Sequence, residues 1–179
     1  MMATHPVVAT KEHLLTSSRD EDFHSFFAAE AEPLRRFAPF LIGDHDRACD
    51  LAQEALVRTY RHWGRIHGAE AGPYARRVLV NLVRSEHRRS IVRRKHDRAT
   101  DHPTISHSDR VDEWLRLSTA LEVLPPMRRA AVVLRFYEDM SEADIARTLD
   151  RPIGTIKSDI HRGLARLRRE LEGPGSEDS

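Results

Sequence analysis

Two helical patterns separated by a short turn, close to the end of the sequence, constrain the fold more than any other feature. The first pattern begins at Ser141, which can cap a helix together with Asp144, because serine followed three residues later by an acidic residue is a typical helix start. Residues 150–152 form the predicted turn. Beyond it, apolar residues recur at the spacing of one helix face, at Ile153, Ile156, Ile160, Leu164 and Leu167. This arrangement predicts a helix-turn-helix over residues 141–162.

The predicted second helix is basic on the side that its apolar residues leave exposed. Its outward positions are Lys157, His161, Arg162, Arg166, Arg168 and Arg169. Cationic and hydrogen-bonding side chains on such a helix suit contact with phosphates and base edges in the major groove of DNA. A solvated helical hairpin is the alternative, because arginine-rich outer faces are common. The short turn, and the small Ala146 where the two helices must approach, favour the DNA-binding interpretation.

Charge is distributed unevenly along the chain of 179 residues, although its formal net charge is only +1. Residues 19–54 carry nine acidic and four basic side chains, whereas residues 76–98 carry nine basic and two acidic ones. A local excess of cations attracts nucleic acid even where the net charge does not. The basic segment is therefore a candidate second DNA surface.

The residue content argues against several classes of protein. Cys49 is the single cysteine, so no internal disulfide and no cysteine-based metal site can form, which suits a reducing cytoplasm. The chain has neither a signal peptide nor an apolar run of membrane-spanning length. His96, His102 and His107 lack the paired spacing of metal ligands. Without a glycine-rich phosphate loop or a nucleophile with its base, we expect no metal, no cofactor and no enzyme activity.

Hydrophobic periodicity predicts an all-α fold of two small helical domains joined by a flexible linker. No stretch alternates apolar and polar residues as a half-buried strand would. The most regular helical pattern follows Asp44 or Asp46 as a cap and continues to Trp63, and a proline at position 33 favours a break before it. The predicted boundaries are a disordered tail over residues 1–20, a first domain over 21–95, the linker over 96–112, a second domain over 113–172 and a tail over 173–179.

Longer motifs occur in both halves. Residues 46–56 read DRACDLAQEAL, and residues 74–81 read YARRVLVN, followed by further arginines. Residues 121–141 read LEVLPPMRRAAVVLRFYEDMS, and residues 154–158 read GTIKS. Two independent motifs in a fixed order are much more specific than a helix-turn-helix alone.

In this order, the motifs resemble regions 2.2, 2.4 and 4 of the sigma factors of bacterial RNA polymerase, specifically the small extracytoplasmic-function group of the sigma-70 family. The resemblance covers roughly residues 23–171. It implies a factor that binds core RNA polymerase at its beta-prime and beta subunits, recognises the minus-35 and minus-10 promoter elements and promotes strand opening. The polymerase would supply all catalytic chemistry. Many members of the family are held inactive by an anti-sigma factor, which makes such a protein a further candidate partner.

The resemblance also implies roles for particular residues. Docking on a coiled coil of the beta-prime subunit would involve Asp46, Asp50, Gln53 and Glu54. Binding of the melted minus-10 element would involve Trp63, Arg76, Arg77, Asn81, Arg84, Arg88 and Arg89, together with the loop over residues 64–72. Reading of the minus-35 duplex would involve Thr155, Lys157, Ser158, His161 and Arg162. For Trp63 and Tyr74, core packing is an equally good interpretation.

The chain departs from the family pattern at four positions in the helix-turn-helix. Asp150 stands where the turn usually carries glycine, Arg151 replaces an apolar residue and Pro152 replaces a serine or threonine cap. Asp159 adds a negative charge to the helix that would read DNA. The minus-35 sequence of relatives therefore does not transfer to this chain.

Two other classes share part of this pattern. A stand-alone helix-turn-helix regulator would resemble residues 121–171, but its other domain would sense a ligand or a phosphate, and residues 23–95 predict neither strands nor a carboxylate pocket. A helical interaction module, such as an anti-sigma factor or an adaptor, would not bind DNA. The nine cations of residues 76–98 argue against that class.

Overall fold

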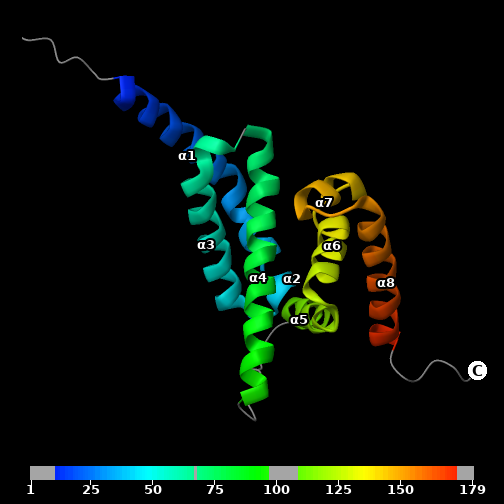
Figure 1. Ribbon diagram of the computed structural model, residues 1–179. Helices are drawn as coiled ribbons and strands as arrows, with labels where there is room; N and C mark the ends of the chain where they lie inside the picture. Colours follow the sequence, from blue (N-terminus) through cyan, green and yellow to red (C-terminus); the bar gives the residue numbers. More distant parts are fainter. Residues whose placement is uncertain (1–10, 67, 97–108, 173–179) are drawn as a thin grey trace, which may run out of the picture.

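The computed structural model describes residues 11–66, 68–96 and 109–172, and every regular element in these ranges is a helix (Figure 1). The elements are α1 (Lys11–Phe37), α2 (Pro39–Ile42), α3 (His45–His62), η1 (Trp63–Arg65), η2 (Gly68–Glu70), α4 (Ala71–His96), α5 (Asp109–Glu122), α6 (Pro126–Phe136), α7 (Glu142–Leu149) and α8 (Ile153–Glu172), where η1 and η2 are short 3-10 helices. The predicted all-α fold is confirmed. No helix in these ranges is both long and apolar enough to span a bilayer.

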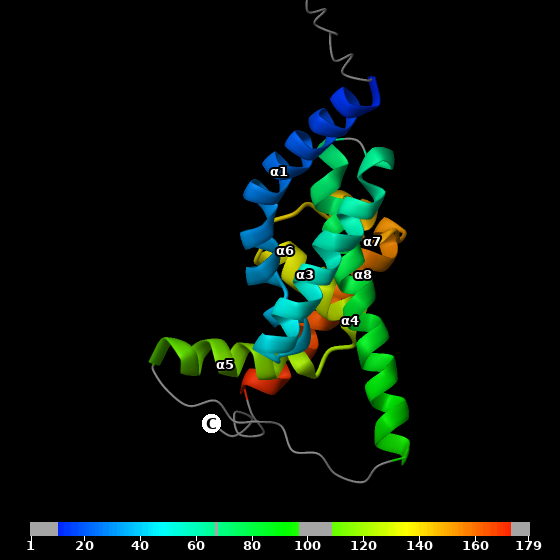
Figure 2. The same ribbon diagram turned by 90° about the vertical axis from the view of Figure 1, so that its left-hand side faces the viewer.

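Helices α1, α3 and α4 of the first half lie side by side, and the short α2 joins α1 to α3 (Figures 1 and 2). Helix α2 ends at Gly43, whose φ of +75° lies in the left-handed region that glycine adopts without steric cost. Asp44 then caps α3, because its carboxylate accepts a hydrogen bond from the backbone N–H of Arg47 at 3.0 Å. The α3 residues buried in this half are Ala48, Leu51, Ala52, Ala55, Leu56 and Thr59.

Helix α1 begins earlier than the sequence predicts. It starts at Lys11, whereas the predicted tail extends to Asp20; residues 1–10 lie outside the described residues. Arg19 donates through Nη2 to the carbonyl oxygen of Tyr60 at 3.2 Å, and the Tyr60 hydroxyl donates to the Asp20 carboxylate at 2.9 Å. These contacts hold the end of α1 against α3, and local periodicity cannot predict them because the partners lie 40 residues apart.

Helix α1 also continues through Pro33, where the sequence predicts a break. Proline removes one backbone donor from the helix and crowds the preceding turn. Burial compensates for this cost, since Leu34 and Phe37 on the same turn are almost completely excluded from solvent.

Helices α7 and α8 form the predicted helix-turn-helix. The Ser141 hydroxyl accepts a hydrogen bond from the backbone N–H of Asp144 at 3.1 Å and donates one to the Asp144 carboxylate at 2.6 Å. This hydrogen bond, helped by one from Arg147, lowers the pKa of the Asp144 carboxyl. At the turn, Asp150 has a φ of +54°, a left-handed conformation that aspartate adopts more readily than most residues. The predicted cap and turn are confirmed.

Helix α8 approaches α6 closely at the buried Gly163. A Cβ atom added there would lie 2.6 Å from Cγ2 of Val132, closer than van der Waals contact allows. We expect Gly163→Ala to lower the free energy of unfolding by about 1–2 kcal/mol, because overpacking outweighs the better helix propensity of alanine. Urea unfolding followed by circular dichroism measures the change, and an unchanged midpoint would contradict this close approach.

The two halves of the chain pack against each other. Helix α4 contacts α6 and α7, and α2 contacts α5 and α6 (Figure 1). Buried apolar residues of both halves form one continuous core, from Leu34 in α1 to Leu167 in α8. Of the predicted linker, residues 97–108 lie outside the described residues, as does the tail over 173–179. Periodicity predicts which face of a helix is buried but not its partner, so this contact is a finding of the structure.

Candidate nucleic-acid and polymerase interfaces

Four of the predicted minus-10 residues form one polar stripe along helix α4. We call Arg77, Asn81, Arg84 and Arg88 the α4 stripe. Their spacings of four, three and four residues place them on one helix face. Asn81, Arg84 and Arg88 are exposed, while Arg77 is half-buried with its guanidinium carbon 5.4 Å from the centre of the Tyr74 ring. The stripe thus offers three cations and an amide to a ligand along α4.

The acidic residue within this part of α4 is already neutralised. Glu86 accepts hydrogen bonds from Arg47 of α3, from Nε at 3.2 Å and from Nη2 at 3.0 Å. The hydrogen bond with Glu86 raises the pKa of the Arg47 guanidinium. Arg89 is 73% exposed and its Nη1 lies 3.9 Å from Glu86, a distance at which an exposed pair contributes little. The positive charge of the α4 stripe and Arg89 therefore remains available.

Arg76 does not join the other predicted minus-10 residues. Its side chain is 12% exposed and is held between two carboxylates. Nη1 donates to Glu30 of α1 at 2.9 Å, and Nε and Nη2 donate to Glu138 at 3.0 and 2.6 Å. Arg76 has no free donor directed to solvent comparable to those of the α4 stripe.

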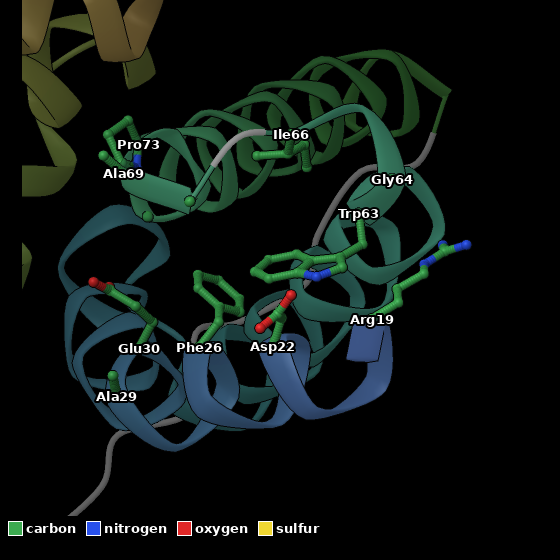
Figure 3. Close-up of a pocket in the computed structure, with 12 residues that line it drawn as sticks. Arg19, Asp22, Phe26, Ala29, Glu30, Trp63, Gly64, Ile66, Ala69 and Pro73 are labelled. Atoms are coloured by element: carbon green, nitrogen blue, oxygen red, sulfur yellow. The ribbon is translucent and has the colours of Figure 1, made fainter. Parts of the chain in front are cut away.

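Trp63 lies at the edge of a pocket between α1 and the segment that leads into α4 (Figure 3). The pocket has a volume of about 760 Å³. Phe26, Trp63, Ile66 and Pro73 contribute apolar walls, while Arg19, Asp22 and Glu30 contribute charge. The Trp63 ring packs on the rings of Phe23 and Phe26, with centroids 5.1 and 4.9 Å away. Both interpretations of Trp63 therefore hold together, because the ring packs in an aromatic cluster and also lines an open pocket.

The predicted minus-35 residues lie on one side of helix α8. Lys157, His161 and Arg162 are exposed, and Thr155 and Ser158 are half-buried. Lys157 Nζ lies 3.7 Å from a Glu142 carboxylate oxygen, an exposed pair of little energetic weight. In Figure 1, α6 and α7 separate α8 from α4, so the two cationic helices lie on different parts of the molecule.

Asp159, the unusual acid of this helix, points toward arginines of its own domain. Its two carboxylate oxygens lie 3.4 Å from Nε of Arg128 and 3.4 Å from Nη1 of Arg151. The Asp159 side chain is 16% exposed, so these cations largely neutralise it. The sequence suggested a negative charge facing DNA, whereas the structure places an internal brace.

We expect Asp159→Asn to raise the affinity for random-sequence duplex DNA about threefold at fixed salt, because Arg128 and Arg151 lose their shared counterion. The same change should lower stability by about 1 kcal/mol. Asp150→Asn removes an equal charge from the exposed turn and keeps the left-handed conformation accessible. Fluorescence anisotropy compares the two variants, and equal affinity gains would show that Asp159 does not restrain the arginines.

The predicted polymerase-binding residues extend along helix α3. Asp46, Asp50 and Gln53 are exposed and, with Val57, follow spacings of four, three and four residues on one face. We call these four residues the α3 stripe. Glu54 lies beside it and is half-buried, with one oxygen 2.6 Å from Nη2 of Arg58. Val57 is 44% exposed, and sequence reasoning missed it, although its spacing from Gln53 was a usable signal.

Within the described ranges, no group of three or more histidine, cysteine, aspartate or glutamate side chains is arranged to hold a metal ion. Sequence reasoning also missed Glu138 and Arg129, which contact the first half of the chain. No local pattern identifies such residues, because their partners belong to a distant segment.

Comparison with known proteins places both halves. Profiles of the families Sigma-70 region 2 and Sigma-70, region 4 match residues 26–91 and 114–167. The RNA polymerase sigma-E factor of Streptomyces avermitilis is 39% identical over 158 residues, which covers 84% of this chain and 86% of the relative. The ECF RNA polymerase sigma factor SigL of Mycobacterium tuberculosis is 30% identical over 161 residues, covering 84% of this chain and 89% of the relative.

A solved structure shows the same fold. The sigma factor RpoE of Bartonella quintana, crystallised in complex with the anti-sigma factor NepR, matches with a TM-score of 0.68 and 25% identity. The match covers 86% of this chain and 99% of RpoE. Since these relatives align across both halves in the order of the motifs, this chain belongs to the extracytoplasmic-function group of the sigma-70 family, the factors that give bacterial RNA polymerase its promoter specificity.

Proposed function

We propose that this sigma factor grips its promoter at two points, with the α4 stripe on the melted minus-10 element and α8 on the minus-35 duplex. The observation that carries the proposal is the exposure of two separate cationic helix faces, one in each half of the chain. A stand-alone regulator would need one such face.

The minus-10 role of α4 follows from what single-stranded DNA requires. Melted DNA exposes phosphates that need cations and bases that need stacking or a pocket. Arg84 and Arg88 supply exposed cations, and Asn81 supplies an amide that can both donate and accept hydrogen bonds. The pocket beside Trp63 has aromatic walls and a volume suited to an unstacked base. Arg77 and Arg89 extend the cationic surface on either side.

The minus-35 role of α8 follows from its position as the second helix of the motif. Residues on the first turns of this helix enter the major groove in helix-turn-helix proteins. We assign phosphate or guanine contacts to Lys157 and Arg162, whose long cationic side chains are exposed. Thr155, Ser158 and His161 supply shorter hydrogen-bonding groups nearby.

The α3 stripe and the adjacent Glu54 are proposed to bind the coiled coil of the beta-prime subunit. An acidic and amide ridge is complementary to a basic partner helix, and complementary charge speeds association. The exposed Val57 adds apolar area that a solvated face would not need. A further contact with the beta subunit is proposed for the second half of the chain.

The factor is proposed to carry no catalytic residue and to work in the cytoplasm, where the polymerase that performs the phosphodiester chemistry is found. An anti-sigma factor is a further proposed partner, supported by the complex in which the similar RpoE was crystallised.

Reconstitution tests the proposal. The protein is mixed with core RNA polymerase, and transcripts initiated on genomic promoter fragments are sequenced. We expect holoenzyme on native gels and initiation at a defined set of promoters. A protein that shifts duplex DNA alone, and forms no holoenzyme, would instead be a stand-alone regulator.

A further inference from the structure

The contact between the two halves involves the helix that we assign to the minus-10 element. Helix α4 packs against α6 and α7, and α2 packs against α5 and α6 (Figures 1 and 2). The second half therefore covers one side of α4, next to the α4 stripe. The polar and aromatic contacts that cross this boundary are specific.

The first contact is the ion pair between Arg76 and Glu138. Glu138, in the turn after α6, accepts hydrogen bonds from both Nε and Nη2 of Arg76 through one oxygen, at 3.0 and 2.6 Å. Both side chains are only 12% exposed. Glu30 of α1 binds the remaining end of Arg76 at 2.9 Å. A cation in the basic segment is thus neutralised by one acid from its own domain and one from the other domain.

The second and third contacts involve α2. The rings of Phe40 and Tyr137 lie with their centroids 4.6 Å apart. Arg129 of α6, almost fully buried, donates through Nη1 to the carbonyl oxygen of Leu41 at 2.7 Å. The side chain of Glu122 occupies the space beside Gly43, where an added Cβ would overlap its carboxylate. Each of these contacts requires α2 and the second domain in one fixed relation.

We propose that this contact is a closed, autoinhibited state of the sigma factor, in which Glu138 masks Arg76 and the second domain covers part of the minus-10 surface. This inference rests on the proposed function of α4. DNA phosphate and Glu138 compete for the same guanidinium, so binding of the melted strand requires the Glu138 contact to break. A binding-competent state that is only partly populated lowers the apparent affinity in proportion to its population.

The closed state also bears on the two-point grip. In Figure 1, α6 and α7 lie against α4 while α8 occupies the far side of the second domain. Contacts at Arg76, Phe40 and Leu41 fix the distance between the α4 stripe and α8. Breaking them lets the two DNA-binding helices separate to fit two promoter elements.

The test compares Glu138→Ala with Glu30→Ala. Each change removes one carboxylate from Arg76, but Glu138 crosses the domain boundary and Glu30 does not. Dyes are attached at Ala28→Cys on α1 and Ala165→Cys on α8 in a Cys49→Ser background, and energy transfer reports the distance between domains. We expect lower transfer efficiency in Glu138→Ala, and in Tyr137→Ala as a second variant, with Glu30→Ala matching the parent protein.

Single-stranded DNA provides the second measurement, with fluorescein-labelled dT20 as the probe for the unlabelled proteins. We expect Glu138→Ala to bind dT20 about fivefold more tightly than the parent and Glu30→Ala to change affinity less than twofold. Equal gains in both variants, or transfer efficiency that no interface variant alters, would overturn the closed state.

Failure of the closed state can be distinguished from failure of the proposed function. If energy transfer is insensitive to Glu138→Ala while the reconstituted holoenzyme still opens promoters, only the closed state is wrong. If energy transfer responds as expected while no holoenzyme forms, the proposed function is wrong and the interdomain contact stands.

Discussion

Arg84→Ala combined with Arg88→Ala is expected to reduce promoter opening about a hundredfold while changing the affinity for core polymerase less than twofold. Both cations are exposed on the α4 stripe. A charge-assisted contact to phosphate is worth about tenfold in affinity, and two of them act together here. The dependence of DNA affinity on salt should also weaken by about two phosphate contacts. Permanganate footprinting measures opening, and native gels measure holoenzyme formation.

Asp50→Ala combined with Gln53→Ala is the matched control, since it removes two exposed polar side chains from the α3 stripe. This pair should weaken core binding and leave opening by the assembled holoenzyme intact. If both pairs of changes reduced core affinity to the same extent, the division of roles between α3 and α4 would be wrong.

Arg129→Ala is expected to lower the free energy of unfolding by about 2–4 kcal/mol. Arg129 is 6% exposed and donates to three carbonyl oxygens, those of Leu41, Glu122 and Leu124, at 2.7, 2.9 and 3.2 Å. Alanine would leave these acceptors without their charged donor and open a cavity between the halves. Burial already lowers the pKa of the Arg129 guanidinium, as expected for a cation removed from water.

The adjacent Arg128 provides the control for this prediction. Its side chain is 26% exposed and pairs with Asp159 at 3.4 Å. We expect Arg128→Ala to cost less than about 1 kcal/mol, because the pair is partly solvated. Urea unfolding of both variants gives the comparison, and similar losses would contradict the structural role of Arg129.

Local features of this fold could be predicted from the sequence. The cap formed by Ser141 and the left-handed turn at Asp150 depend on residues within one or two helical turns, and the structure has both. The same locality explains the cap at Asp44. By contrast, the continuation of α1 through Pro33 depends on burial against other helices, which no local pattern contains.

The candidate DNA surface was predictable in part. Arg76 and Arg77 are neighbours in the basic segment, yet they lie on different faces of α4. Counting four and seven residues from Arg76 reaches Val80 and Val83, which are both buried. This spacing was a usable signal that Arg76 faces inward. Its partner Glu138 was not predictable, because 62 residues separate the two.

Photocrosslinking in the open complex tests the two-point grip most directly. A photoreactive amino acid is placed at His87, beside the α4 stripe, or at Arg166, on the outer face of α8, and holoenzyme is assembled on a promoter fragment found by reconstitution. We predict that the α4 probe labels unpaired bases of the melted segment and that the α8 probe labels duplex DNA farther upstream on the same promoter. Labelling of the same duplex site by both probes, without any need for core polymerase, would contradict the account.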